Sequence, residues 1–406
     1  MAIFNEIQKN LEKVSTFMNL NQNEIDLLLK HKKVSSAMLN VDGKSYNAYR
    51  IIHNNALGPG KGGIRFHPDV SEDEVRSLSF WMSLKTSLMG LPLGGAKGGV
   101  RINPKEASEE EIEKVSREYI RAFHEVIGAD KDIPAPDVYT NGKIMSFMLD
   151  EYEKIKNKHE PGMITGKPIE LGGIKIRNDS TSKGGLIVLE EFLIKKNLQN
   201  IKVVIQGFGN AGNNIAKMLF EKGHKIIAVS DSKGGIYDDN GLNIKELLEL
   251  KSNGKSVVDH PDSQRTLSNT EILELDCDVL VLAALENQIT NENADKIKAR
   301  NILELANGPI TSDADAVLFK KDINVLPDIL ANAGGVVVSY FEWLQNKVGN
   351  IFEEEFLKQK LDEIMKNAFS EVYKFQEKNN ELDLRSSSYV IAIERILAAE
   401  KLRGNL

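Results

Sequence analysis

The segment 201–231 constrains the fold more than any other part of the chain. It opens with an apolar run at 201–206 that shows no alternation, as in a strand buried on both faces of a parallel sheet. The glycine motif G-x-G-x-x-G follows, and then come a helical pattern, a second apolar run and an aspartate. This order predicts a βαβ unit with a dinucleotide-binding fingerprint, and therefore a doubly wound α/β domain.

Each member of the fingerprint has a physical role. Gly207 permits the tight turn, Gly209 lets backbone amides approach a pyrophosphate at the helix N-terminus, and Gly212 allows close helix packing. Asp231, 24 positions after the first glycine, would bind the ribose hydroxyls. Three turn glycines in an unrelated α/β protein are the alternative, which the flanking strand, helix and acid disfavour. The predicted dinucleotide loop is Gly207, Phe208, Gly209, Asn210, Ala211 and Gly212.

The rest of the chain divides by pattern. Apolar runs at 279–283, 301–305 and 323–326 continue the strand and helix rhythm. Up to about residue 175 helices dominate. These expected helices span 71–89 and 108–127, which open with the capping boxes Ser71/Glu74 and Ser108/Glu111, and 141–152. At 406 residues the chain exceeds the size of one core, so two domains are expected, 1–175 and 176–354.

Three lysines lie among or near glycines between residues 58 and 100. Lys61 and Lys97 are flanked by glycines, so backbone packs closely around them. Lys85 falls on the apolar stripe of the helix at 71–89, where an unpaired charge costs several kcal/mol and implies an anionic partner. One such lysine would by default be a snorkelling residue at the edge of the stripe. Three within 37 residues favour a site for a small anion.

Other polar candidates are ordinary when taken alone. Asp137 follows two prolines that stiffen its loop, and by default it is a turn residue. Thr181 lies at an expected helix start and Asn307 in an expected turn. Asn332 precedes a glycine pair that allows close approach to a ligand, and Ser339 would by default be an ordinary helix serine.

Composition limits the class of protein. A net charge of −7 argues against nucleic acid or an anionic membrane as partner. The N-terminus lacks a signal pattern and no apolar run approaches the length of a membrane span, so a cytoplasmic protein is expected. The single cysteine, Cys277, is expected to be a packed strand residue. The seven histidines are scattered, so no metal site is expected.

Five long motifs occur in order along the chain, and they begin at Gly58 (GPGKGGIRFHP), Leu93 (LGGAKGGV), Ile133 (IPAPDVYTN), Gly207 (GFGNAG) and Asn332 (NAGGVVVSYFEW). They resemble the motifs of the glutamate dehydrogenases within the wider amino-acid dehydrogenase family. The resemblance implies NAD(P)-dependent oxidative deamination of an L-amino acid to a 2-oxo acid and ammonia. It also implies a substrate domain of α/β type and a Rossmann-like dinucleotide domain, with catalysis in the cleft between them. C-terminal helices of about 355–406 that return to the substrate domain, and a homohexamer, are implied as well.

The resemblance also implies site residues. Lys97 matches the catalytic lysine, which is neutral when its pKa falls and can activate water, and Asp137 matches the proton-transfer aspartate. Lys85 matches the lysine that holds the α-carboxylate. Lys61 and Ser339 match the pair that receives the γ-carboxylate of glutamate, a position that is apolar in the leucine and phenylalanine branches. Keeping both polar groups favours L-glutamate, since an apolar side chain would leave Lys61 unpaired.

Further matches concern the cofactor. Thr181 matches a residue near the nicotinamide amide and Asn307 one near the nicotinamide ribose. Asp231 should repel the 2′-phosphate of NADP, whereas neighbouring hydroxyls and Lys233 could accept it, so NAD is slightly favoured and use of both cofactors stays open. The remaining cofactor residues expected are Ser232, Ala283 and Asn332.

Two departures from the family pattern stand beside these matches. Leu282 replaces the proline that is usual before Ala283, and the segment 179–185 reads DSTSKGG where an Ala-Thr-Gly type of sequence is commoner. Two alternatives remain: the same chemistry on leucine, valine or phenylalanine, or a catalytically silent nucleotide-binding relative. The presence of Lys97 and Asp137 disfavours the second alternative.

Overall fold

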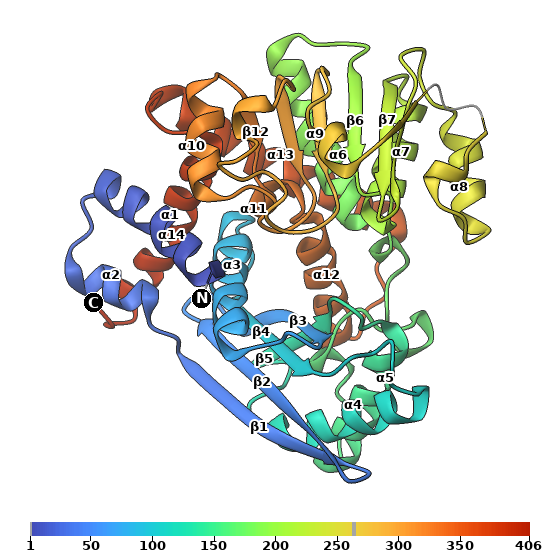
Figure 1. The fold of residues 1–406 in the computed structure, drawn as a ribbon. Helices are drawn as coiled ribbons and strands as arrows, with labels where there is room; N and C mark the ends of the chain where they lie inside the picture. The colour runs from blue at the N-terminus through green and yellow to red at the C-terminus, as the bar shows by residue number, and fades with distance from the viewer. Residues whose placement is uncertain (1, 262–264) are drawn as a thin grey trace. The chain divides into compact units, whose positions relative to one another are not determined.

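The computed structural model describes residues 2–261 and 265–406, which form two units (Figure 1). The first unit comprises the chain up to Arg177 together with Val336–Lys360 and Tyr389–Leu406, and the second comprises Asn178–Gly335 and Leu361–Ser388. These units differ from the expected domains in two places. Residues 336–354 belong to the first unit rather than the second, and residues 361–388 do not return to the first unit.

The first unit contains a five-stranded sheet of order β1-β2-β4-β3-β5. β1 pairs antiparallel with β2 and β2 with β4, whereas β3 is parallel to both β4 and β5. Helices do hold more residues than strands up to residue 175, as expected, but the sequence pattern did not identify these five strands. The strands are β1 (Lys33–Val41), β2 (Lys44–Asn54), β3 (Gly60–His67), β4 (Gly95–Arg101) and β5 (Asp132–Pro136).

The sequence pattern did not identify β3 and β4 as strands because both are rich in glycine, which is rare in strands. The fold needs glycine at these positions. A Cβ atom on Gly62 of β3 would lie 1.6 Å from the carbonyl oxygen of Ala96 on β4. The glycines therefore let β3 and β4 approach more closely than side chains would permit, which fits the close backbone packing expected around the lysines.

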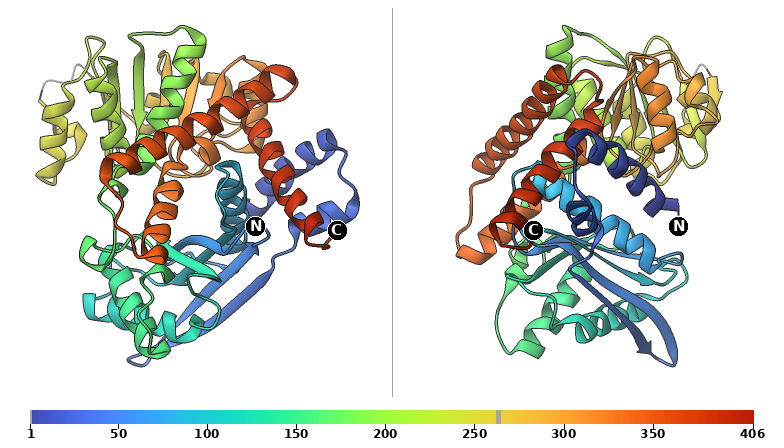
Figure 2. Two further views of the ribbon diagram at one scale, coloured as in Figure 1. Left: turned by 180° about the vertical axis from the view of Figure 1, so that it is seen from behind. Right: turned by 90° about the vertical axis from the view of Figure 1, so that its left-hand side faces the viewer.

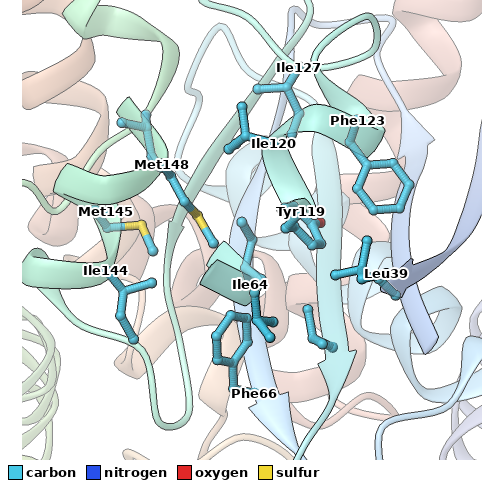
Figure 3. Close-up of a cluster of buried hydrophobic side chains, with 14 of the residues drawn as sticks. Leu39, Ile64, Phe66, Tyr119, Ile120, Phe123, Ile127, Ile144, Met145 and Met148 are labelled. Atoms are coloured by element: carbon cyan, nitrogen blue, oxygen red, sulfur yellow. The ribbon is translucent and has the colours of Figure 1, made fainter. Parts of the chain in front are cut away.

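Helices cover both faces of this sheet, and one face holds the larger core of the unit. Ile64 and Phe66 of β3 pack there against Tyr119 and Met148 of the covering helices (Figure 3). The helices of the unit are α1 (Ala2–Met18), α2 (Gln22–Leu29), α3 (Glu72–Leu88), α4 (Glu109–Phe123), α5 (Gly142–Lys156), the greater part of α12 (Gly334–Val348), the start of α13 (Glu354–Lys378) and the end of α14 (Leu384–Leu402).

The expected helix at 71–89 is confirmed as α3, with Ser71 as its N-cap. The Ser71 side chain accepts a hydrogen bond from the Glu74 amide at 3.3 Å. The reciprocal bond of a capping box is not made, because the Glu74 carboxylate binds Arg65 instead. α4 behaves alike: Ser108 caps it, and Glu111 binds Lys44 and Tyr46. Tertiary ion pairs thus take the acids that the local pattern assigned to capping.

The second unit contains a seven-stranded sheet of order β12-β11-β10-β6-β7-β8-β9. Its first five strands in this order are parallel, β8 pairs antiparallel with β7, and β9 pairs antiparallel with β8. Helices lie on both faces (Figures 1 and 2), so the doubly wound fold is confirmed. The strands are β6 (Lys202–Gln206), β7 (Lys225–Asp231), β8 (Gly234–Tyr237), β9 (Arg265–Leu267), β10 (Val279–Leu282), β11 (Asn301–Glu304) and β12 (Asn324–Leu326).

The helices of the second unit include the one that the fingerprint predicted, α7 (Asn210–Glu221). α13 packs against α6, where a Cβ atom on Gly184 would lie 3.2 Å from Met365. Cys277 is buried beside β10, and burial raises the pKa of its thiol to about 12. The other helices are α6 (Ser180–Lys196), α8 (Ile244–Ser252), α9 (Asn269–Leu273), α10 (Ser312–Lys320), α11 (Asp328–Ala331) and the parts of α13 and α14 within 361–388.

A buried ion cluster ties four elements of the second unit together. Arg385 of α14 binds Glu304 of β11 at 2.7 Å, Asp315 of α10 at 2.8 Å and Asp328 of α11 at 3.3 Å. Burial and the neighbouring carboxylates of Asp328 and Asp315 together raise the pKa of Glu304 to about 7, against the attraction of Arg385. No helix in the described part of the chain is long and apolar enough to span a membrane.

Candidate active site

The dinucleotide fingerprint lies at the switch point of the second sheet. β6 is followed in the chain by β7 on one side, whereas β10 lies on its other side, so the strand order reverses between β6 and β10. In doubly wound sheets ligands bind at the carboxyl ends of the strands at this point. A cavity of about 710 Å³ opens there. Its lining includes Gly207, Gly209, Asn210, Asp231, Ser232 and Ala283.

The three glycines of the fingerprint have the expected roles. Gly207 has φ of +92°, a left-handed conformation, and a Cβ atom there would lie 2.7 Å from the Ala283 carbonyl carbon. A Cβ atom on Gly212 would lie 1.7 Å from the Gly207 carbonyl oxygen. Gly209 caps α7 and has nothing within 4 Å of its Cβ position, so the amides at this helix end are open to a ligand. This cradle fits a pyrophosphate.

Asp231, at the end of β7, lines the cavity with its carboxylate held by four neighbours. Lys251 Nζ binds it at 2.8 Å, Ser256 Oγ at 2.8 Å, and the amides of Val257 and Lys233 at 3.0 Å. Burial opposes its ionisation, but these hydrogen bonds prevail and lower the pKa to about 2. Asp231 therefore stays anionic, while Lys251 compensates its charge.

The structure brings together several other expected cofactor residues at the carboxyl edge of this sheet. The Asn332 amide donates to Asn307 Oδ1 at 2.9 Å and to the Leu305 carbonyl at 3.3 Å. Thr181 is not the cap of α6, since Asp179 is, but it lies in the first turn. A Cβ atom on Gly335 would lie 2.9 Å from Thr181 Oγ1, so this glycine admits the threonine. Leu282 replaces a proline without disturbing β10, where it pairs with Gln206.

In the first unit, the register of the sheet places four charged side chains on one face. Lys61 and Arg65 of β3 are four residues apart, so they point to the same side. Ile64 is paired with Gly98 of β4 and with Pro136 of β5, which brings Lys97 and Asp137 to that side as well. Gly63 lies in the centre of this face, and a Cβ atom there would lie 2.7 Å from Asp137 Cβ.

Lys97 and Asp137 form an ion pair at 3.0 Å. Burial lowers the pKa of Lys97, and Arg65 lowers it further against the opposing attraction of Asp137. Although burial raises the pKa of Asp137, Lys97 and Arg65 together hold it well below its usual range. The Asp137 amide donates to Thr140 Oγ1 at 2.7 Å, which fixes the turn. This pair holds a lysine that loses its proton readily beside a carboxylate that stays ionised.

Lys61 is 1% exposed, and it has no hydrogen bond or ion pair within residues 2–261 and 265–406. Burial lowers its pKa well below the usual value, and repulsion from Arg177 and Arg50 adds to this effect. Arg177 donates to the hydroxyl of Ser339, on α12. The arrangement presents two cations and a hydroxyl, which suits a carboxylate ligand.

Comparison with known proteins identifies the family to which this chain belongs. Residues 172–404 match the family Glutamate/Leucine/Phenylalanine/Valine dehydrogenase, and residues 31–154 match the Glu/Leu/Phe/Val dehydrogenase, dimerisation domain. The chain belongs to the Glu/Leu/Phe/Val dehydrogenase family. It is 47% identical over 363 residues to the NAD-specific glutamate dehydrogenase of Staphylococcus aureus, covering 89% of this chain and 87% of that one.

Other members of the family are similarly close. The catabolic NAD-specific glutamate dehydrogenase RocG of Bacillus subtilis is 44% identical over 374 residues, which cover 92% of this chain and 88% of the relative. The crystal structure of glutamate dehydrogenase from Peptoniphilus asaccharolyticus superposes with a TM-score of 0.87 at 37% identity, covering 100% of both chains. The leucine-bound, hetero-hexameric enzyme of Thermus thermophilus gives 0.93 at 32% identity, with 99% and 97% covered.

In this member of the family, Lys85 occupies the buried face of α3, as expected, and is 8% exposed. The buried residues of α3 are not confined to the predicted apolar stripe but include others on further sides of the helix. Ser77 and Thr86 satisfy their hydroxyls by donating to backbone carbonyls four residues earlier, Asp73 and Met82. Small hydroxyl residues therefore let α3 pass through the unit with few unsatisfied polar groups around Lys85.

The sequence analysis did not identify two cations near the proposed substrate site of this chain, Arg65 and Arg177. Arg65 lies inside the quoted motif at 58–68, and the alternation of β3 would have placed it beside Lys61 had the segment been read as a strand. Arg177 lies in an irregular segment, η3 (Lys175–Arg177), where no periodicity or spacing identifies it. Only the tertiary contact with Ser339 reveals it.

Proposed function

We propose that this chain catalyses the NAD-dependent oxidative deamination of L-glutamate to 2-oxoglutarate and ammonia, and the reverse reductive amination. It is a glutamate dehydrogenase, an oxidoreductase that acts on CH–NH2 donors. The curated relatives at 44% and 47% identity are NAD-specific glutamate dehydrogenases. Two residues in the first unit, Lys61 and Ser339, favour glutamate within the family, because their polar groups match a side-chain carboxylate.

The observation that carries the choice of glutamate is the buried ammonium of Lys61. Its own chain supplies it with a cationic neighbour, Arg177, instead of a counter-ion in contact. A glutamate γ-carboxylate would compensate the Lys61 ammonium and accept a hydrogen bond from the Ser339 hydroxyl. The side chain of leucine or valine would leave the Lys61 ammonium buried without an anion in contact, at a cost of several kcal/mol.

The chemistry at the α-carbon falls to Lys97 and Asp137. Asp137, held ionised, accepts a proton from the substrate ammonium, so that the amine can form the imino acid as hydride leaves the α-carbon. Lys97, whose pKa burial lowers, gives up its proton more readily than an exposed lysine, and in its neutral form it takes the proton of the water that attacks the imino carbon. Asp137 then returns a proton to the leaving ammonia. Lys85 binds the α-carboxylate and so orients the α-carbon.

NAD is the cofactor, and it supplies the acceptor for hydride. Backbone amides at the N-terminus of α7 would hold its pyrophosphate, with Gly209 giving the approach, and Asp231 would bind the adenosine ribose. Thr181, Asn307 and Asn332 would hold the nicotinamide half. The residues that would hold the cofactor thus belong to the second unit, and Lys61, Lys85, Lys97 and Asp137, which would hold and activate the amino acid, belong to the first.

Oligomerisation through the first unit belongs to the same proposal. β1 is the end strand of its sheet, so one of its edges has no partner strand among the described residues. An open edge of nine residues, with Met38 58% exposed, suits pairing with a second copy of the chain. We expect a homohexamer in which this edge is one contact, and a cytoplasmic location, which fractionation of cells would test.

A substrate panel tests the function. Reduction of NAD is followed by absorbance with glutamate, leucine, valine and phenylalanine, each at several concentrations. Glutamate should give the highest kcat/KM, and NAD should be preferred to NADP. A higher value for an aliphatic or aromatic amino acid would move the assignment to another branch of the family, and no turnover with any of them would favour a silent relative.

A further inference from the structure

We infer that Arg65 and Glu74 are positioning residues whose opposite charges set the pH at which the Lys97–Asp137 pair is active. Neither residue belongs to the set that the resemblance implied. The inference rests on the proposed acid–base roles of Lys97 and Asp137, and goes beyond them by naming what controls their protonation.

The geometry is a chain of four alternating charges. Lys97 Nζ lies 3.0 Å from Asp137 Oδ1, and Arg65 Nε donates to Asp137 Oδ2 at 3.0 Å. The other end of the Arg65 guanidinium binds the Glu74 carboxylate. Because Lys97 and Arg65 take different oxygens of Asp137, the arginine fixes the rotation of that carboxylate and aims Oδ1 at the lysine.

These contacts come from separate elements. Lys97 is on β4, Arg65 on β3, Asp137 in the turn after β5, and Glu74 in the first turn of α3. The side chains of Arg65, Asp137 and Glu74 are each 16–17% exposed, so the charges interact through a largely dry medium. Asp137, Arg65 and Glu74 are the charged groups that act most strongly on Lys97.

Arg65 and Glu74 have opposite effects on the pKa of Lys97. Arg65 lowers the pKa of Lys97, after the larger effect of burial, and it lowers the pKa of Asp137 too. Glu74 raises the pKa of Lys97. Both Lys97 and Asp137 must lack their extra proton to begin deamination. The arginine therefore extends activity towards lower pH, and the glutamate limits that extension.

The test measures kcat/KM for glutamate against pH, with saturating NAD, in Arg65→Met and Glu74→Gln. Removing the cation should raise both pKa values and move the midpoint of the acid limb up by about 1 pH unit or more. Glu74→Gln keeps the shape of the side chain and leaves Arg65 uncompensated, so the midpoint should move down. Opposite shifts distinguish electrostatic control from a structural role, which would lower kcat without ordered shifts.

Two further variants serve as controls. Arg65→Lys keeps a cation, so its midpoint should lie nearer to that of the wild type than the midpoint of Arg65→Met. Glu72→Gln removes a charge from the same helix, where Glu72 binds Arg76 at 2.7 Å, and should not move the midpoint. If Arg65→Met does not fold, Glu74→Gln still decides.

Shifts in the same direction, no shift in Glu74→Gln, or equal shifts in Arg65→Lys and Arg65→Met would overturn the inference. Lys97→Met and Asp137→Asn are measured alongside. If they keep turnover, the proposed acid–base roles fail and this inference fails with them. If they lose turnover while the opposite shifts are absent, only the control by Arg65 and Glu74 is rejected.

Discussion

At the scale of single residues, the activity depends on side chains whose chemistry their surroundings alter. Lys97→Met should abolish turnover while folding and NAD binding persist, because the fingerprint lies in the other unit. Asp137→Asn keeps the shape and removes the proton acceptor, so kcat should fall by about 10²-fold or more. Steady-state kinetics, with circular dichroism and NAD titration as controls, check both. Near-normal kinetics in either variant would return that residue to a structural role.

The γ-carboxylate pocket gives a second prediction. Wild type should prefer glutamate to leucine by more than about a thousandfold in kcat/KM, since leucine leaves Lys61 uncompensated. The double variant Lys61→Leu with Ser339→Val should lose most of its activity on glutamate and keep Lys85, Lys97 and Asp137 for the common core of amino acids. Activity on norleucine or methionine is measured in the same panel. A double variant that still prefers glutamate would contradict the pocket assignment.

Asp231 gives a third prediction, on the cofactor. Asp231→Ser should shift preference towards NADP, because it removes a carboxylate that repels the 2′-phosphate and leaves Lys251 free to attract it. The ratio of kcat/KM for the two cofactors is the measurement. Lys233→Ala, which leaves the carboxylate in place, serves as the control. An unchanged ratio in Asp231→Ser would mean that the carboxylate does not face the ribose.

At the scale of elements, the ion cluster of the second unit should make stability depend on pH. The folded state raises the pKa of Glu304 from 4.5 to about 7, so its proton stabilises the fold below about pH 4.5 and this contribution is lost as pH rises through 7. Each unit of pKa difference corresponds to roughly 1.4 kcal/mol. Urea unfolding at pH 5 and pH 8 should show a larger loss for wild type than for Glu304→Gln. Equal losses would show that Glu304 is ionised throughout.

Elements also explain which local patterns sufficed. Ser71 and Ser108 cap α3 and α4, as their patterns indicated, because a cap needs only neighbouring residues. Asn141 caps α5 in the same way. β3 and β4 escaped prediction, since Gly62 and its neighbours are selected by the approach of one strand to another. A requirement of this kind produces no alternation of apolar and polar residues, so a sequence pattern does not detect it.

At the scale of the whole molecule, assembly gives the last prediction. Met38→Glu places a charge on the exposed side of the edge strand β1 and should reduce the mass of the particle below six times 45.2 kDa. Light scattering after size-exclusion chromatography measures the mass. Ile194→Glu, at a residue of α6 that is 71% exposed, is the matched control and should leave it unchanged. A hexamer that persists in Met38→Glu would remove β1 from the proposed interface.

The sequence by itself determined the doubly wound domain and most of the candidate site residues. Gly207, Gly209 and Asp231 lie within one βαβ unit, where local spacing and geometry coincide. Long motifs likewise identified Lys97 and Asp137, because these motifs match those of the family. Tertiary structure alone decided the rest. Arg65 bridges Asp137 and Glu74, and Arg177 reaches Ser339 from 162 residues away, because charges interact by distance in space, which the order of the chain does not reveal.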